Sequence, residues 1–247
     1  MKSDKVNNDF YDSYGDRWYT AHDDPVALLR AEGRIKNAWI TETIRGKFGE
    51  EKITVLDVAC GGGFLANRLA AEGHTVTGVD ISHSSLAAAA ARDATRSVRY
   101  LQADGYRLPF ADGSFRVVCM MDFLEHVEDR QAVIREASRV LVPGGLFFFH
   151  TINRNVFAWF LIIKCVEWFV RNTPHHMHVL RLFTKPREIR EMCRRSGLDV
   201  VEIRGIRPRL NADLIRIPLT GVVGEGFGFT FTPLTLFSFI GYARKRP

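Results

Sequence analysis

Residues 55–64 read VLDVACGGGF, an apolar run that ends in three consecutive glycines. Uninterrupted apolar runs bounded by glycine are typical of strands that are buried on both faces of a parallel sheet. Four further runs of this kind follow along the chain, at 74–80, 98–104, 115–121 and 145–151. Helical patterns separate them at 64–72, 84–94 and 129–141. Alternating strands and helices predict a doubly wound, Rossmann-like α/β fold around a mostly parallel sheet.

The flanking segments extend this core. Apolar residues recur at helical spacing over 25–48, which predicts an N-terminal amphipathic helix. LDVVEIRGI (198–206) and TLFSFIGYARK (235–245) read as two more strands, which bring the predicted sheet to seven. We expect one domain over 1–247, with a helical cap (1–50), a ligand-binding core (51–152), an apolar and basic insertion after the fifth strand (153–195) and C-terminal strands (196–247).

The composition bounds the class of protein. With 46% hydrophobic and 25% charged residues, the 247-residue chain is that of a folded globular protein. Its four cysteines form no CxxC pair, which argues against a zinc ribbon or a secreted disulfide framework. No apolar segment follows the N-terminal lysines, so we expect a cytoplasmic protein. The net charge of +6 suits an anionic lipid surface, whereas the dispersed arginines and the lack of a recognisable motif argue against nucleic acid.

The glycine loop predicts a ligand site. In a doubly wound sheet, ligands bind beyond the carboxyl ends of the strands, where Gly61 and Gly63 would let the backbone approach a ligand closely. Asp80 ends the second strand and is placed to accept both hydroxyls of a ribose. Because the loop also fits the pattern GxGxxG/A, these residues alone leave a dinucleotide open as the ligand.

Two more aspartates separate the alternatives. Asp57 precedes the loop and Asp104 ends the third strand, and carboxylates in these places disfavour a pyrophosphate. A ligand that carries an ammonium, a ribose and an adenine but no phosphate suits this acidic rim, and S-adenosylmethionine is such a ligand. The competing reading of each aspartate is an ordinary turn or helix cap. Because all three aspartates lie near the ends of predicted strands, a shared ligand site explains them better than three separate caps.

These residues stand within longer motifs. VLDVACGGGFLANRLAAEGHTVTGVDIS, LPFADGSFRVVCM, LEHV and VLVPGGLFFF resemble the class I S-adenosylmethionine-dependent methyltransferases. More narrowly, CMMDFLEHV, TINRNVFAWF and FTKPREI resemble the ubiquinone biosynthesis O-methyltransferases, which methylate polyprenylated catechols. The resemblance runs from about Phe10 to Gly205. It implies an enzyme that methylates a hydroxyl of a phenolic quinone precursor.

Carried over by position, the resemblance places Ala59 and Met121 at the cofactor with Asp80, and brings Arg34 or Lys36 to it from the N-terminal helix. Ala59 stands where the family usually has glycine, a change that suits only a backbone without a positive φ. The full predicted cofactor-binding set is Arg34, Lys36, Asp57, Ala59, Gly61, Gly63, Asp80, Ile81, Asp104, Gly105 and Met121.

A cluster of acids around a histidine follows the fourth strand. Asp122, Glu125 and His126 have the spacing i, i+3, i+4, which places them on one face if the segment is helical. The family has Glu, then Glu-His, at these positions and is associated with a divalent metal. We therefore predict that the three residues are catalytic and bind magnesium, manganese or zinc, which would lower the pKa of the acceptor hydroxyl. The alternatives are metal-free chemistry with His126 as general base, and a solvated helix start.

The segment NVFAWFLIIKCVEWFVR (155–171) is apolar except for Lys164, Glu167 and Arg171, which share one face. It is too short and too interrupted to span a bilayer, but it suits a helix lying in a membrane interface, with tryptophans at headgroup depth. A lid packed on the catalytic core is the competing reading. With the basic stretch 181–195 and the family resemblance, we expect peripheral contact with the inner face of an anionic membrane.

Three functions remain open at this point. The leading one is O-methylation of a catechol-type, polyprenylated quinone precursor with S-adenosylmethionine. The others are O-methylation of a soluble phenol or other secondary metabolite, and a cofactor-binding assembly partner without catalysis. The presence of Asp122, Glu125 and His126 favours an enzyme.

Overall fold

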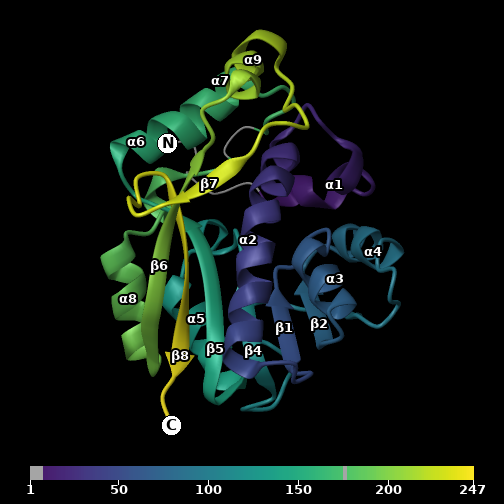
Figure 1. Ribbon diagram of the computed structural model, residues 1–247, viewed down its shortest axis with the longest axis vertical. Coiled ribbons are helices and arrows are strands. Elements are labelled where there is room, and N and C mark those ends of the chain that lie inside the picture. Colours follow the sequence, from purple (N-terminus) through teal and green to yellow (C-terminus); the bar gives the residue numbers. More distant parts are fainter. Residues whose placement is uncertain (1–7, 175–176) are drawn as a thin grey trace.

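A computed structural model of the chain describes residues 8–174 and 177–247. Its central feature is an eight-stranded sheet in the order β3-β2-β1-β4-β5-β8-β6-β7 (Figure 1). The strands are β1 (Thr54–Val58), β2 (Thr75–Asp80), β3 (Arg99–Gln102), β4 (Phe115–Met120), β5 (Leu141–Ile152), β6 (Leu198–Pro208), β7 (Phe229–Thr232) and β8 (Ser238–Lys245). β1 to β5 are parallel, whereas β8 is antiparallel to both β5 and β6.

Helices cover both faces of the sheet, which confirms the predicted doubly wound architecture. The α-helices are α1 (Arg17–Thr20), α2 (Pro25–Phe48), α3 (Phe64–Ala71), α4 (His83–Ala91), α5 (Arg130–Val140), α6 (Val156–Ala158), α7 (Val166–Phe169), α8 (Pro186–Arg195) and α9 (Ala212–Thr220). Short 3-10 helices lie at η1 (Asp9–Ser13), η2 (Leu124–His126) and η4 (Leu180–Leu182), and η3 (Trp159–Cys165) is a π-helix.

Alternation along the strands sends neighbouring side chains into two cores. In β4, Val117 and Cys119 pack with α2 and α3, whereas Val118 and Met120 pack with α5 and α8. All four side chains are fully buried, as expected for a central strand of a sheet covered on both faces. The carboxyl end of β4 is therefore held rigidly at the middle of the sheet.

The sheet has one strand more than the seven predicted. The additional strand, β7, is four residues long and pairs antiparallel with the last residues of β6 at the edge of the sheet. Its side chains are only partly buried, and it follows a glycine-rich loop. The run is therefore too short to show the alternating or continuous apolar pattern by which strands are predicted.

The apolar insertion is helical, as predicted, and runs through α6, η3 and α7 beyond one end of the sheet (Figure 1). The end of this segment and α9 pack with the first turns of α2 in a small core of their own. Within the described residues, no helix is long and apolar enough to cross a membrane. Lys164 and Glu167, which the sequence places on one face, form an ion pair of 3.1 Å.

Candidate active site

A cavity of about 610 Å³ opens beyond the carboxyl ends of β1, β2 and β4. The N-terminal segment, through Asn8, Tyr11 and Trp18, supplies another part of its wall. Nine of the predicted cofactor-binding residues line it: Lys36, Asp57, Ala59, Gly61, Asp80, Ile81, Asp104, Gly105 and Met121. The cavity therefore gathers nearly the whole predicted set, and their contact with the cofactor stays a prediction.

The glycine loop is packed beneath an aromatic side chain. Gly61 has a φ of 51°, and a Cβ there would lie 2.8 Å from the Trp18 indole. Gly63 has a φ of 76° and begins α3, where a Cβ would lie 2.7 Å from the Cβ of Ala89. Gly63 is absent from the cavity lining. The loop therefore needs glycine both for its backbone turn and for the close approach of its neighbours.

Asp80 is fixed by the loop that it faces. Its two carboxylate oxygens accept hydrogen bonds from the backbone N–H groups of Gly61, at 2.8 Å, and Ser82, at 2.9 Å. Burial nevertheless raises the pKa of Asp80 above its ordinary value. Because each carboxylate oxygen has a second lone pair, the side chain can still accept from both hydroxyls of a ribose.

Asp57 and Asp104 lie in different surroundings. Asp57 is buried at the end of β1, and this burial raises the pKa of its carboxyl to about 7. Asp104 accepts a hydrogen bond of 2.9 Å from the backbone N–H of Tyr106, the turn contact of the competing cap reading. Asp104 lines the cavity as well, so the cap and the predicted ligand contact are compatible.

The backbone at Ala59 departs from the expectation for a non-glycine residue. Its φ is 57°, in the left-handed region that disfavours a Cβ. The condition under which alanine suits this position is therefore not met, and the turn from β1 into the loop carries local strain.

The two basic candidates from α2 lie apart. Arg34 donates to the backbone carbonyl of Phe227 at 2.5 Å and does not line the cavity. Lys36, two residues further along α2, is 2% exposed and lines it. The structure thus brings Lys36, and not Arg34, to the site.

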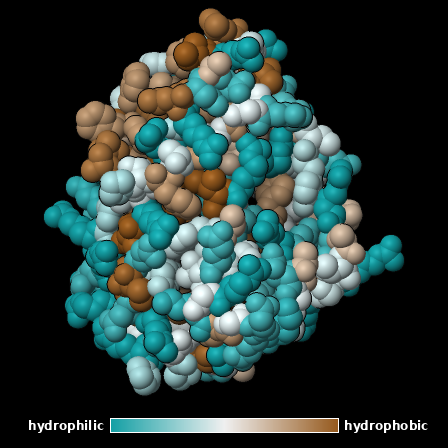
Figure 2. Space-filling view, viewed as in Figure 1, coloured by the Kyte–Doolittle hydropathy of each residue, from teal (hydrophilic) through white to brown (hydrophobic). Residues whose placement is uncertain are grey.

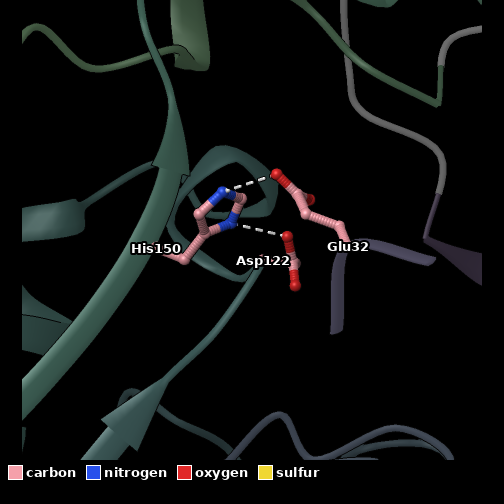
Figure 3. A group of neighbouring side chains, drawn as sticks. All are labelled: Glu32, Asp122 and His150. Carbon is pink, nitrogen blue, oxygen red and sulfur yellow. Dashed lines mark ion pairs between the residues drawn. The ribbon is translucent and has the colours of Figure 1, made fainter. Parts of the chain in front are cut away.

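Asp122 is the centre of a buried ionic cluster. Its Oδ2 lies 2.5 Å from Lys36 Nζ and its Oδ1 lies 2.6 Å from His150 Nδ1. Glu32 completes the cluster, with Oε2 3.3 Å from Lys36 Nζ and Oε1 3.3 Å from His150 Nε2 (Figure 3). Glu32 and Lys36 come from α2, His150 from β5, and Asp122 follows β4 with a φ of 53°.

Charge balance sets the protonation of this cluster. Burial disfavours the Asp122 carboxylate, but Lys36 and His150 outweigh it and hold the pKa of Asp122 far below its ordinary value. Burial and Lys36 oppose a proton on His150, yet Glu32 and Asp122 raise the pKa of His150 to about 9. Near neutral pH the cluster therefore holds two carboxylates, one ammonium and one imidazolium.

Glu125 is paired with Thr151 instead of joining the ion pairs of this cluster. It is 2% exposed, and its Oε2 accepts a hydrogen bond of 2.9 Å from the hydroxyl of Thr151. Burial and the charge of Asp122 raise the pKa of Glu125 to about 7. Near pH 7 the side chain is therefore only partly ionised, and it is already paired with Thr151.

His126 has a defined tautomer. Asn8 Nδ2 donates to the His126 carbonyl at 3.2 Å, which turns Asn8 Oδ1 toward His126 Nδ1 at 3.0 Å. A carbonyl oxygen only accepts, so Nδ1 carries the proton and Nε2 keeps its lone pair. Burial lowers the pKa of His126 to about 4. His126 lines the cavity as a neutral imidazole that is able to accept a proton.

A second histidine lies beside the first. His178 has its ring centroid 5.4 Å from that of His126, and burial lowers its pKa to about 3. His178 is partly buried. His175 and His176 lie outside the described residues.

Sequence reasoning missed Glu32, His150 and the partners of Lys36. Each had a visible signal. Glu32 and Lys36 form an i, i+4 charged pair in a helix that also carries the buried Ile40 and Ile44. His150 interrupts the otherwise apolar run of β5. A charged residue inside an apolar pattern indicates a buried ion pair. The partner in that pair is identified only by the tertiary structure.

Comparison with known proteins agrees with this geometry. A model of the methyltransferase domain matches residues 56–149. A ubiquinone biosynthesis O-methyltransferase of Escherichia coli O157:H7 is 34% identical over 200 residues, which cover 79% of this chain and 81% of the relative. The one of Thiobacillus denitrificans is 38% identical over 156 residues, 62% of this chain and 67% of the relative.

The chain belongs to the class I S-adenosylmethionine-dependent methyltransferases. Two solved structures share its fold. A SAM-dependent methyltransferase of Thermotoga maritima has a TM-score of 0.65 at 17% identity and covers 96% of this chain and 98% of its own. A magnesium protoporphyrin IX methyltransferase of Synechocystis, with S-adenosylhomocysteine bound, has a TM-score of 0.61 at 17% identity and covers 86% of this chain and 84% of its own. This methyltransferase is an enzyme whose cofactor is S-adenosylmethionine.

Proposed function

We propose that this methyltransferase transfers a methyl group to a hydroxyl of a catechol-type, polyprenylated quinone precursor. The observation that carries the proposal is the neutral His126 in the same cavity as the acidic cofactor rim of Asp80 and Asp104. A phenolic hydroxyl must lose its proton to become a good nucleophile. Near pH 7 the His126 imidazole is unprotonated and has a lone pair to accept that proton, but its lowered pKa makes it a weak base, so the acceptor oxygen must also be stabilised by other groups of the site. The names of the curated relatives support the acceptor class.

The residues of this chain have separate tasks in the reaction. Asp80 and the glycine loop hold the nucleoside, so that the sulfonium methyl faces the acceptor in line. His126 Nε2 accepts the hydroxyl proton, while Asn8 keeps the proton on Nδ1. S-adenosylmethionine supplies the methyl group, and the protein supplies alignment and the base.

The predicted metal does not fit the three residues named for it. Asp122 is already paired on both oxygens by Lys36 and His150, and Glu125 is paired with Thr151. Within residues 8–174 and 177–247, the one group whose ligand atoms lie within 4.8 Å of one another is Glu32, Asp122 and His150, which includes neither Glu125 nor His126. Lys36 Nζ lies within 3.5 Å of all three. No step of the proposed reaction therefore passes through a metal.

We further propose that the insertion rests on the inner face of an anionic membrane, where a polyprenyl tail would be dissolved. Figure 2 shows hydrophobic side chains gathered at the end of the molecule that carries α6, α7 and α9. Phe157, Phe160 and Trp168 are 64%, 51% and 62% exposed in the insertion, and Leu219 of α9 is 81% exposed. Exposed apolar residues in such numbers on adjoining elements favour contact with lipid.

The test is to incubate the enzyme with labelled S-adenosylmethionine and a lipid extract, with and without chelator, and to identify the product by mass. We expect a methylated polyprenyl catechol in both samples. His126→Ala should lower kcat by about 10²-fold or more, and Asp80→Ala serves as a control that loses cofactor binding. If label appears only in water-soluble phenols, the acceptor is a soluble phenol and not a polyprenylated quinone precursor. If activity is lost in chelator and returns with magnesium, manganese or zinc, the reaction depends on a divalent metal and the metal-free proposal is wrong.

A further inference from the structure

The ionic cluster at Asp122 has the form of a cation site with a cation already in it. Glu32, Asp122 and His150 offer ligand atoms within 4.8 Å of one another. The Lys36 ammonium lies among them, 3.3 Å from Glu32 Oε2, 2.5 Å from Asp122 Oδ2 and 3.5 Å from His150 Nδ1 (Figure 3 shows the three partners). A second cation there would have to displace the ammonium or lie against it.

The ammonium has one donor more than its carboxylate partners use. Lys36 donates to Glu32 and to Asp122, whereas an ammonium has three N–H groups. Its third neighbour, His150 Nδ1, is engaged with Asp122 at 2.6 Å and accepts nothing while it donates there. Lys36 and Asp122 both line the cavity. The third N–H group of the Lys36 ammonium is therefore placed to donate to a ligand in the cavity.

The position along the cavity indicates the acceptor. Asp122 follows β4, and Lys36 is bound to it, whereas the ribose aspartate Asp80 ends β2 two strands away. The neutral His126 lines the same cavity four residues after Asp122. The ammonium and the proposed base thus come from the same part of the wall.

We propose that Lys36 is the resident cation of the active site and that its ammonium donates a hydrogen bond to the acceptor oxygen during methyl transfer. This inference rests on the proposed O-methyl transfer. The hydroxyl proton passes to His126 Nε2, and an oxygen lone pair forms the bond to the methyl carbon. The carbon–sulfur bond breaks with its electron pair going to sulfur, which gives S-adenosylhomocysteine. Lys36 keeps all of its protons and stabilises the negative charge that develops on oxygen.

The other members of the cluster position Lys36. Glu32 Oε1 accepts from the hydroxyl of Ser238 at 2.9 Å while Oε2 holds the ammonium. His150 is 1% exposed and anchors Asp122 from behind. Because two carboxylates face an ammonium and a protonated imidazole, the cluster is close to neutral and its burial is tolerable.

The first arm of the test measures metal binding without any acceptor. The thermal unfolding of wild type, of Lys36→Met and of Lys36→Met/His150→Ala is followed with and without Mn²⁺ or Zn²⁺. We expect no stabilisation of the wild type through this cluster. The single variant should gain a metal-dependent rise in Tm and bind one equivalent, because Glu32, Asp122 and His150 are then free to act as ligands; the double variant should lose both. A wild type that binds one equivalent, with loss in His150→Ala, would overturn the inference.

The second arm measures catalysis in a double variant that leaves the net charge of the cluster unchanged. Lys36→Met/Glu32→Gln removes one charge of each sign, and Glu32→Gln is the matched control. Relative to that control, the Lys36 variant should lose about 10²- to 10³-fold in kcat, as expected for one donor to a developing oxyanion. Affinity for S-adenosylhomocysteine should stay within about threefold. In a parallel Lys36→Ala/Glu32→Gln variant, whose shortened side chain leaves room for an amine, added ethylammonium should restore part of kcat, a rescue that a purely structural role would not give.

The outcomes separate this inference from the function on which it rests. If the wild type methylates no catechol, the proposed function is wrong, and the metal arm still decides whether Lys36 holds the cation position. If the Lys36 variant loses S-adenosylhomocysteine binding while kcat at saturating cofactor is unchanged, Lys36 binds the cofactor, as the sequence predicts, and the inference is wrong. Loss of kcat without amine rescue and with a lowered Tm would also refute it.

Discussion

Ala59 turns the chain out of β1 with a φ of 57°, a conformation in which its Cβ crowds the following carbonyl. Ala59→Gly should raise the free energy of unfolding by about 0.5 to 1 kcal/mol, because relief of left-handed strain exceeds the added entropy of unfolded glycine. Urea unfolding of the two proteins measures the change. As a control, Ala87→Gly at an exposed position of α4 should destabilise by about 1 kcal/mol. A loss of stability at both positions would contradict this account.

Glu125 links the stability of the enzyme to pH. Its pKa is raised from 4.5 to about 7, so between these values the folded state binds a proton that the unfolded state releases. The contribution of Glu125 to the free energy of unfolding should therefore fall as the pH rises through this window and level off above it. Glu125→Gln keeps a neutral partner for Thr151 and should lack this contribution, so the difference between the wild-type and variant curves isolates Glu125. Denaturant titrations from pH 5 to pH 8 would reveal this, and parallel curves for both proteins would count against it.

At the scale of an element, the insertion is unusual because large apolar side chains lie on its exposed side. Replacing Phe157, Phe160 and Trp168 by serine should release the enzyme from anionic liposomes, because each large apolar side chain contributes roughly 1.5 to 3 kcal/mol when fully buried. Flotation of liposomes measures binding. Val201→Ser, which changes a 54% exposed residue of β6, is the matched control. A wild type that does not float would leave the insertion as a lid only.

For the whole molecule, the sequence was sufficient wherever the signal is local. The strands that form the middle of the sheet and the α2, α3 and α5 helices carry their own periodicity, and the cavity follows from the glycine loop and Asp80. β7 was missed because its pairing, not its composition, makes it a strand.

The ionic cluster at Asp122 shows why the remainder could not be predicted from the sequence. The spacing of Asp122, Glu125 and His126 suggests one helical face, but Asp122 has a left-handed backbone and only Leu124–His126 forms a short 3-10 helix. The partners of Asp122 come from positions 86 residues before it and 28 residues after it, Lys36 and His150. Pairing over such separations is decided by the tertiary fold.

Trp18 has a consequence for what counts as the functional unit of this enzyme. The matched methyltransferase model begins at residue 56, yet the indole that packs on Gly61 and Gly62 comes from a helix that precedes it. Trp18 is fastened from the other side by a 3.1 Å hydrogen bond to Ser85. The glycine loop and the indole that packs on it are thus encoded in separate stretches of the chain. A graft of the matched segment alone would carry the glycine loop and Asp80 without the N-terminal part of the cavity wall, which includes Trp18. Transferring the complete cavity to another scaffold would therefore require both stretches together.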